Sequence, residues 1–278
     1  MAGPQFDERD CLYDLAIGCV FQDEAPYLRE WIEFHLHLGV QHFLLVNDRS
    51  NDNYQSVLGS YVDAGVVTLL ESPCPEDLRG KRWPDYQRGL YASLCKETAG
   101  QVRWLALIDV DEFLVPGTFG RSIPQVLGDF EGIGAVYVRW EPFGTSYLPR
   151  LDPGRPMIDQ LRLKWRFRAG HEMLGKSIVK PHCVSRANIH LHELLPGCAT
   201  HDLNPGMRYE EAELKLYHYW SRDEQYLFDV KLPRSGKIKG WDLDEIGEDY
   251  FKNLFNEVED GVMPDYAKIV QRRLEAVL

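Results

Sequence analysis

The residues with the clearest chemical potential are three carboxylates in four consecutive positions, Asp109, Asp111 and Glu112, with Val110 between the first two. They follow an apolar run at 105–108 that has the composition of a buried strand. If the strand continued through them, Asp109 and Asp111 would lie on one side with Glu112 beside them. Carboxylates this close raise one another's pKa unless a cation compensates their charge.

Mg²⁺ or Mn²⁺ is the natural cation for such a cluster, because each takes one or two carboxylates and completes its shell with phosphate oxygens and water. Such an ion would offset the charge that develops on a departing diphosphate. The alternative is that Asp109 caps a turn while the other two carboxylates are simply exposed. The spacing alone does not decide between these interpretations.

The composition argues against two other kinds of site. The chain of 278 residues has a formal net charge of −12, whereas a groove for a nucleic-acid backbone needs a basic excess. The six cysteines are scattered without a Cys-x-x-Cys pair, which argues against structural zinc and favours reduced thiols.

The sequence shows no targeting or anchoring segment. Its first residues lack a basic stretch followed by an apolar run, and no stretch approaches the roughly 18 apolar residues of a membrane span. We therefore expect a cytoplasmic protein without a transmembrane segment, although peripheral association with a membrane is compatible with the sequence.

The elements that must position the carboxylates follow an alternating pattern. Residues 15–21 form a short apolar run typical of a buried parallel strand, and 27–38 carry an apolar stripe at helical spacing that Gly39 ends. The predicted order is strand 15–21, helix 27–38, strand 41–46, helix 56–64, strand 66–71, helix 85–98 and strand 104–108. This alternation indicates an α/β fold, in which ligands bind at the carboxyl ends of the strands, here beside the loops at 22–26 and 47–53.

The second half of the chain is harder to interpret. We expect a helix at 123–127, a strand at 135–140, and strand-like pieces at 177–179 and 214–219. Residues 73–84 and 142–172 are expected to be irregular, the latter as a long loop or an irregular hairpin. The last fifty or so residues are expected to be helical, with a terminal apolar-spaced segment from Tyr266. One predicted helix face there contains Tyr250, Leu254, Phe255 and Val258.

Six segments, in order along the chain, form a recognisable series. They are FQDEAPYLREWIEFH at 21–35, VNDRSND at 46–52, Gln87, IDVDEFL at 108–114, WEPFG at 140–144 and HYWSR at 218–222. Together they resemble the glycosyltransferases of family 92 and their family-2-like relatives, which adopt the GT-A fold and carry a DxD motif. Two positions depart from the family: Gln22-Asp23 stands where Lys-Asn is common, and Ser221-Arg222 reverses the usual basic-then-serine order.

This resemblance implies a fold and a division of the chain. The fold is α/β, a Rossmann-like, mixed and mostly parallel sheet flanked by helices, with a C-terminal helical extension. The GT-A domain would span 1–235, with a nucleotide-sugar half at about 12–116 and an acceptor half at about 117–235. Residues 236–278 would form the extension, packed on the same domain.

The resemblance also implies an activity. The protein would be a metal-dependent, inverting glycosyltransferase of the hexosyltransferase type, moving a sugar from a nucleoside diphosphate donor, preferably UDP-linked, to a hydroxyl of a glycan or glycoconjugate. Mn²⁺ or Mg²⁺ would be the cofactor, with Asp111 as a direct ligand, Asp109 reaching ribose or metal-bound water, and His218 as a further ligand. A purely structural role for His218 stays open. The competing histidines are His190, His192 and His201.

Residues for the two substrates follow from the same resemblance. The implied donor-binding residues are Val20, Asp23, Glu24, Asp48, Gln87, Asp109 and Val110. Inverting transfer requires a general base on the acceptor hydroxyl, and no segment identifies it. The candidates for that base are Glu141, Glu193 and Asp202.

Two residue pairs remain with two interpretations each. Trp140 and Phe143 suit the apolar face of an acceptor sugar, and they suit core packing equally. Lys231 and Arg234 suit a departing diphosphate or an exposed surface.

Two other functions use the same features. A nucleotidyltransferase acting on sugar phosphates would use the acidic cluster, but it favours a glycine-rich phosphate loop, and residues 21–26 contain no glycine. A non-catalytic glycan-binding protein with this fold would have no affinity for nucleotides. The retained carboxylates at 109, 111 and 112 argue against that second alternative.

Overall fold

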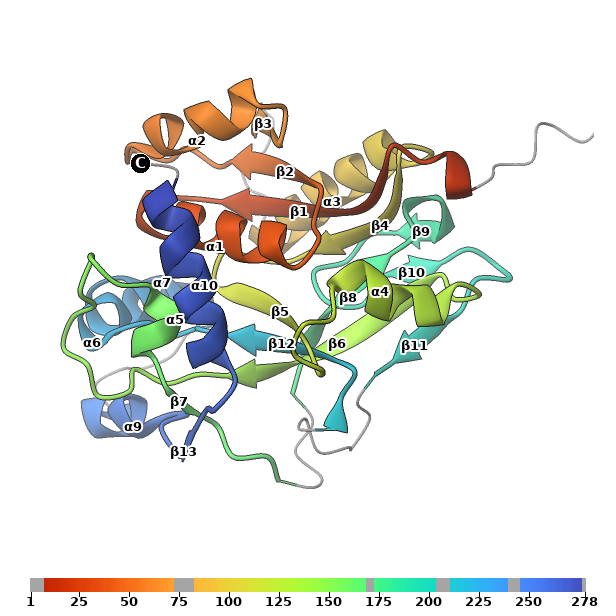
Figure 1. The fold of residues 1–278 in the computed structure, drawn as a ribbon. Coiled ribbons are helices and arrows are strands. Elements are labelled where there is room, and N and C mark those ends of the chain that lie inside the picture. The colour runs from red at the N-terminus through yellow and green to blue at the C-terminus, as the bar shows by residue number, and fades with distance from the viewer. Residues whose placement is uncertain (1–7, 73–82, 169–172, 204–210, 240–245, 277–278) are drawn as a thin grey trace, which may run out of the picture.

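The computed structural model describes residues 8–72, 83–168, 173–203, 211–239 and 246–276. Its centre is a mixed sheet with the strand order β3-β2-β1-β4-β8-β6-β12-β5, and β11 pairs with β6 beside it. The four strands β1 to β4 run parallel, β8 runs antiparallel between β4 and β6, and β12 is parallel to β6 but antiparallel to β5. Helices flank this sheet (Figure 1), so the mixed, mostly parallel architecture expected for the GT-A fold is confirmed.

The elements of the sheet and its flanks have the following bounds. The strands are β1 Tyr13–Phe21, β2 His42–Asn47, β3 Val67–Glu71, β4 Val102–Leu107, β5 Glu112–Pro116, β6 Ala135–Pro142, β7 Leu163–Lys164, β8 Gly175–Val179, β9 Val184–Arg186, β10 Glu193–Leu194, β11 Thr200–Asp202, β12 Leu214–His218 and β13 Val258–Glu259. The helices are α1 Ala25–His37, α2 Tyr54–Asp63, α3 Trp83–Thr98, α4 Ile123–Leu127, α5 Met157–Gln160, α6 Glu224–Tyr226, a π-helical turn at Leu227–Lys231, α7 Leu232–Lys239, α9 Glu248–Asn253 and α10 Met263–Ala276.

The sheet is buried on both faces, which explains the continuous apolar character of β1. Because successive side chains of a strand point to opposite faces, Ile17 and Phe21 join one hydrophobic cluster while Ala16 and Val20 join another. The first cluster holds α1, and the second packs against α3. A central strand covered from both sides places its carboxyl end at a fixed position in the molecule.

The C-terminal helix α10 packs across α1, and Figure 1 draws it in blue in front of the red-orange helix α1. The ring of Tyr266 meets that of Phe34 edge-on with centroids 5.6 Å apart, and Arg273 Nε lies 2.8 Å from a carboxylate oxygen of Glu33.

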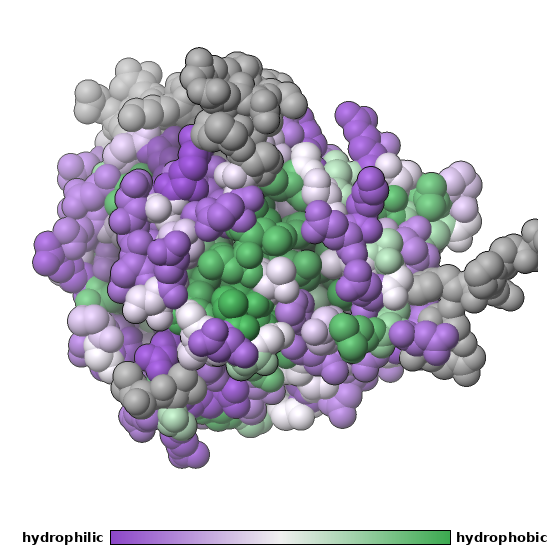
Figure 2. Space-filling model, turned by 90° about the horizontal axis from the view of Figure 1, so that it is seen from above, coloured by the Kyte–Doolittle hydropathy of each residue, from purple (hydrophilic) through white to green (hydrophobic). Residues whose placement is uncertain are grey.

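In Figure 2 hydrophilic residues cover most of one face of the molecule and surround a smaller apolar area. No helix among the described residues is long and apolar enough to cross a membrane.

The strands and helices predicted from 15–21 to 214–219 are confirmed, with bounds that differ by at most two residues. Of the predicted irregular segment at 73–84, residues 73–82 lie outside the described part of the chain. Residues 142–168 contain the short helix α5 and the two-residue strand β7, which pairs with β13 about ninety residues later. No periodicity reveals so short a strand.

The predicted helix face near the C-terminus is wrong. Helix α9 contains Tyr250 but ends at Asn253, so Leu254 lies beyond it. Phe255 has a φ of 64°, which belongs to the left-handed region and interrupts a right-handed helix. Val258 lies in β13. The helical segment with apolar spacing that was predicted from Tyr266 onward is confirmed, since it lies in α10, which buries Tyr266 and Val270 against the body of the protein.

Candidate active site

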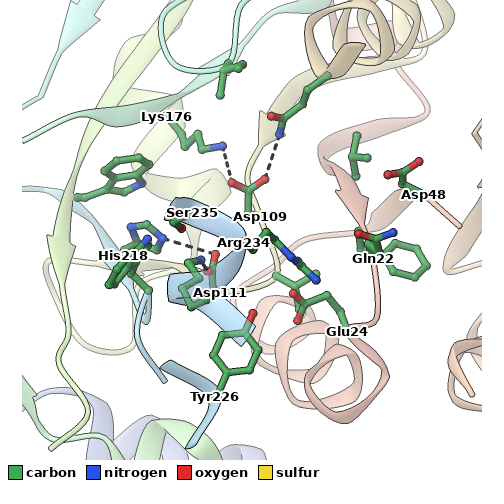
Figure 3. A pocket seen from close by; sticks show the side chains of 18 of the residues that line it. Gln22, Glu24, Asp48, Asp109, Asp111, Lys176, His218, Tyr226, Arg234 and Ser235 are labelled. Carbon is green, nitrogen blue, oxygen red and sulfur yellow. Dashed lines mark hydrogen bonds and ion pairs between the residues drawn. The ribbon is translucent and has the colours of Figure 1, made fainter. Parts of the chain in front are cut away.

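A cleft of about 510 Å³ lies at the carboxyl ends of β1 and β4. The strand ends supply Val20 and Phe21 from β1, and the connection after β4 supplies Asp109, Val110 and Asp111. Figure 3 shows Asp109 and Asp111 at its centre, with Glu24 and Asp48 on the side of β1. This is the edge at which ligands of open α/β sheets bind.

The acidic cluster forms a turn instead of continuing its strand. β4 ends at Leu107, and the backbone N–H of Glu112 donates to the carbonyl of Asp109 over 3.0 Å, so β5 begins at Glu112. Asp109 and Asp111 line the cleft, whereas Glu112 is fully buried and does not. The expectation that all three carboxylates share one small site is therefore wrong for Glu112.

Glu112 holds the turn from beneath. Its Oε2 accepts from the backbone N–H of Asp109 over 2.8 Å, and its Oε1 accepts from the Trp140 indole over 2.6 Å. Burial raises the pKa of Glu112 well above its usual range, against the opposing effect of Lys176. Glu112 thereby fixes the cleft-facing orientation of its neighbours.

Asp109 is bound to a lysine that is almost completely buried. Lys176 on β8 is 1% exposed, and its Nζ lies 2.8 Å from Asp109 Oδ2 and 3.8 Å from Glu112 Oε2. Burial opposes its charge, but the two carboxylates outweigh burial and raise the pKa of Lys176 well above its usual range. The other oxygen, Oδ1, accepts from Gln87 over 3.5 Å and from Tyr91 over 3.3 Å.

Asp111 lies between a second lysine and a histidine. Lys231 Nζ is 2.9 Å from Asp111 Oδ2, and His218 Nε2 is 3.6 Å from Oδ1. Burial favours the neutral acid, but Lys231 and then His218 outweigh it and hold the pKa of Asp111 well below its usual range. Burial lowers the pKa of His218, so its ring favours the neutral state in which a nitrogen lone pair is available.

A buried arginine that follows β12 holds the loop at 22–26 in place. Arg222 is 0% exposed and its guanidinium lies 2.5 Å from a carboxylate oxygen of Glu24. It stacks between the rings of Tyr27 and Tyr226, with its central carbon 3.6 Å and 4.4 Å from their centroids. Ser221 donates to the carbonyl of Phe143, so both residues of the reversed Ser-Arg pair have a structural role.

Asp48 lines the cleft, but Asp23 does not. Asp48 is bound through both oxygens by Arg49 at 2.9 Å each, and Ser72 Oγ lies 3.3 Å from Oδ1. Asp23 instead joins the first two loops, because its N–H donates to Ser50 Oγ and its Oδ1 accepts from the N–H of Asn51. The side chain of Asp23 is thus committed outside the cleft.

None of the three predicted general bases lies in the cleft. Glu141 follows Trp140 on β6 and points to the opposite face of the sheet, into a separate cavity of about 420 Å³, where Lys164 Nζ lies 2.6 Å away. Glu193 on β10 is exposed beside Arg186. The remaining candidate, Asp202, is bound by Arg139.

Of the two aromatic acceptor candidates, only Trp140 lines the cleft. Phe143 is 0% exposed and packs between Tyr217 and Tyr219, with ring centroids 5.0 Å and 4.4 Å away. The core-packing interpretation of Phe143 is therefore correct. Trp140 packs on the His218 ring with centroids 4.5 Å apart.

The structure brings together most of the predicted residues and adds several that the sequence interpretation missed. Predicted residues that line the cleft are Val20, Glu24, Asp48, Gln87, Asp109, Val110, Asp111, Trp140, His218, Lys231 and Arg234. The additions include Lys176, Tyr226 and Ser235. Lys176 had one signal, since a lysine that begins an apolar strand requires a buried partner. Of the competing histidines, His190 lines the cleft.

The pair Asp111 and His218 fits a divalent ion that takes few ligands from the protein. Among the described residues no group of three or more metal-ligating side chains occurs. A carboxylate and a neutral imidazole that face one cleft match the donor chemistry of an ion whose shell is otherwise completed by phosphate oxygens and water. Lys231 occupies one oxygen of Asp111 in this structure.

Comparison with known proteins identifies the family. The model of the family described as "Glycosyltransferase family 92" matches residues 17–254, which is most of the chain. The chain belongs to glycosyltransferase family 92. The segments from 21–35 to 218–222 lie inside the matched range.

Curated relatives from plants support the assignment to family 92. A family 92 protein of Ricinus communis is 24% identical over 217 residues, which cover 74% of this chain and 35% of that protein. One of Oryza sativa subsp. japonica is 25% identical over 220 residues, covering 74% and 33%. The chain spans about a third of the length of these family 92 relatives.

Solved structures show weaker similarity. S. aureus TarS matches with a TM-score of 0.37 and 9% identity, over 61% of this chain and 48% of TarS. Glucosyl-3-phosphoglycerate synthase from Mycobacterium tuberculosis, crystallised with Mn²⁺, UDP and glucosyl-3-phosphoglycerate, matches with a TM-score of 0.35 and 14% identity over 62% and 58%. The assignment to family 92 rests on the family match and not on these structures.

Proposed function

We propose that this family 92 protein is a metal-dependent, inverting hexosyltransferase that moves a sugar from a UDP-linked donor to a hydroxyl of a glycan or glycoconjugate. The observation that carries the proposal is the turn between β4 and β5, which presents Asp109 and Asp111 to a cleft at the carboxyl edge of the sheet. Each carboxylate is held there by a lysine from a distant element.

The nucleoside lies, in this proposal, against the ends of β1 and β2. Val20 and Val110 offer apolar contact, Asp48 and Arg49 offer polar groups for the base or ribose, and Asp109 faces the ribose. These side chains belong to residues 12–116, which we propose as the nucleotide-sugar half of a domain that spans 1–235. Residues 117–235 supply Trp140 for the acceptor and thus form the acceptor half, and 236–278 form the helical extension.

The charge of the cleft favours a divalent cation. Among the described residues that line it, four are carboxylates, Glu24, Asp48, Asp109 and Asp111, and four are cations, Arg49, Lys176, Lys231 and Arg234. A nucleoside diphosphate adds negative charge to a lining that is already balanced. Mn²⁺ or Mg²⁺ held by Asp111 and His218 would supply electrostatic stabilisation of the departing diphosphate.

Lys231 ends the π-helical turn at Leu227–Lys231, Arg234 lies in the first turn of α7, and both line the cleft. A side chain as flexible as that of Lys231 can transfer its ammonium group from Asp111 to a phosphate oxygen. We propose that these two cations bind the diphosphate and neutralise part of the charge that it gains on leaving. Their arrival from late in the chain explains why the cleft needs residues beyond the first half.

The proposal is tested by hydrolysis of UDP-glucose and UDP-galactose in the absence of an acceptor. We expect release of UDP that depends on Mn²⁺ or Mg²⁺. The Asp111→Asn variant should lower that rate at least about 100-fold, because loss of one preorganised electrostatic contact typically costs this much. Glu193→Gln is the matched control, since Glu193 is exposed outside the cleft and the substitution should leave the rate unchanged.

Unchanged hydrolysis in Asp111→Asn would contradict the proposal. Release of inorganic diphosphate from UTP and a sugar 1-phosphate, with no hydrolysis of either UDP-sugar, would instead indicate a nucleotidyltransferase.

A further inference from the structure

The described residues that line the cleft include four carboxylates, and none of these four is unpaired. Each of the four has a carboxylate oxygen in an ion pair with a lysine or an arginine, so none presents an unpaired carboxylate group to an acceptor hydroxyl. The pairs are Glu24 with Arg222, Asp48 with Arg49, Asp109 with Lys176, and Asp111 with Lys231. Among the described residues of the cleft, the proton acceptor must therefore be sought in another kind of side chain.

Two histidines of the described part of the chain line the cleft, and they differ in what engages their rings. His218 Nε2 faces Asp111 at 3.6 Å and belongs to the candidate metal ligands. His190 stands in the connection between β9 and β10, and its Nδ1 lies 3.0 Å from the carbonyl oxygen of Gly175. A carbonyl only accepts hydrogen bonds, so Nδ1 must carry the proton and Nε2 the lone pair.

Both the backbone and the ring of His190 are held in place. The backbone carbonyl of His190 accepts from Ser177 Oγ over 2.7 Å, and the Trp140 indole meets the imidazole ring edge-on with centroids 5.2 Å apart. Nε2 has no hydrogen-bond partner among the described residues. It is also not one of the buried polar atoms of these residues that lack a partner, so solvent in the cleft can reach it. The lone pair is therefore oriented, accessible and adjacent to the aromatic ring proposed to meet the acceptor.

We infer that His190 is the general base that deprotonates the acceptor hydroxyl, an inference that rests on the proposed function. As the hydroxyl oxygen bonds to C1 of the donor sugar, its proton passes to Nε2 of His190. The bond between C1 and the phosphate oxygen breaks, and its electron pair leaves with UDP. The imidazolium then returns its proton to solvent. Gly175 and Ser177 act as positioning residues that fix the tautomer and the segment.

The surroundings of His190 keep its ring neutral. Burial and then Lys176 on β8 lower its pKa, and they outweigh the hydrogen bond to Gly175 and the charge of Asp109, which raise it, while His218 on β12 also lowers it. The base form is therefore dominant at neutral pH, and the rate should fall only as the pH drops below the ordinary histidine pKa of about 6.5.

The test uses two substitutions that separate basicity from support. His190→Asn keeps an amide N–H close to the position of Nδ1, and so retains the donor to Gly175 without Nε2. His190→Gln places its amide near Nε2 instead.

We expect both variants to lower Mn²⁺-dependent hydrolysis of the preferred UDP-sugar about 100-fold or more, which is the range of general-base contributions. Both should also lose the acidic limb of the pH profile. UDP binding should stay within about twofold of wild type. His201→Gln, an exposed histidine on β11, is the control that should behave as wild type.

The outcomes separate this inference from the function on which it rests. If His190→Asn hydrolysed the UDP-sugar at the wild-type rate with UDP binding intact, the ring would only support Gly175, and the inference would be overturned while the proposed function stood. If the wild-type protein bound no UDP in the presence of Mn²⁺, the proposed function would fail and the role of His190 with it.

Discussion

At the scale of single residues, the cleft depends on charged side chains that come from distant positions. The sequence drew attention to Asp109 and Asp111 because they follow an apolar strand, but it did not identify them as the partners of Lys176 and Lys231. The partners are 67 and 120 residues away in sequence, and only the folded sheet brings them together. Burial opposes the charge of Asp111, but Lys231 and then His218 outweigh it and hold its pKa well below the usual range, so this carboxylate keeps the ionised state that a metal ligand requires.

Glu30 provides a residue-scale prediction on the dependence of stability on pH. Its carboxylate is buried and accepts from the backbone N–H groups of Met157 and Ile158 over 2.7 Å and 3.0 Å. Burial raises its pKa to about 7 in spite of these hydrogen bonds. A group whose pKa is higher in the folded state contributes stability fully below its unfolded pKa, near 4.5, and loses it as the pH rises through 7.

Urea denaturation at pH 5 and pH 8 measures this effect. Between these values the wild-type protein should lose up to about 3 kcal/mol of its free energy of unfolding through Glu30. Glu30→Gln, which cannot ionise, should lose correspondingly less over the same interval. An identical loss in both proteins would show that Glu30 does not titrate in this range.

At the scale of elements, hydrophobic periodicity predicted those helices and strands whose burial pattern is visible in the local sequence. The strands and helices predicted from 15–21 to 214–219 were found within two residues, because an apolar run or stripe records burial directly, whereas the buried strand β5 was not predicted. The two-residue strand β7 and its partner β13 were missed, since their pairing depends on contacts across the chain. The direction of Glu141 was missed for a related reason: alternation places it opposite Trp140, and sequence alone did not reveal which of the two faced the cleft.

Helix α10 offers an element-scale prediction. Tyr266 is 1% exposed and packs edge-on against Phe34, but its hydroxyl is buried without a partner among the described residues. Tyr266→Ala should cost about 3–5 kcal/mol in the free energy of unfolding, as other large-to-small core substitutions of aromatic residues do. Tyr266→Phe should be neutral or stabilising by about 1 kcal/mol, because it removes an unpaired polar group.

Urea denaturation of the two variants gives the measurement. A similar loss in Tyr266→Phe and Tyr266→Ala would mean that the hydroxyl makes an essential contact and that ring packing is not what docks α10 onto α1.

At the scale of the whole molecule, one sheet edge collects residues from nearly the entire chain. The cleft takes side chains from Val20, at the carboxyl end of β1, to Ser235 in α7. The negative net charge and the balanced charge of the cleft suit a small anionic ligand accompanied by a cation, and not a polyanion. The family match covers the same range, from residue 17 to 254.

The central claim is that this cleft binds a nucleoside diphosphate together with a divalent cation. Calorimetric titration of UDP into the wild-type protein and into Asp111→Asn, each with and without Mn²⁺, tests it most directly. We predict that Mn²⁺ tightens UDP binding to the wild-type protein at least about tenfold, or 1.4 kcal/mol, and that Asp111→Asn removes this gain. Absence of UDP binding under every condition, or equal tightening by Mn²⁺ in both proteins, would contradict the account.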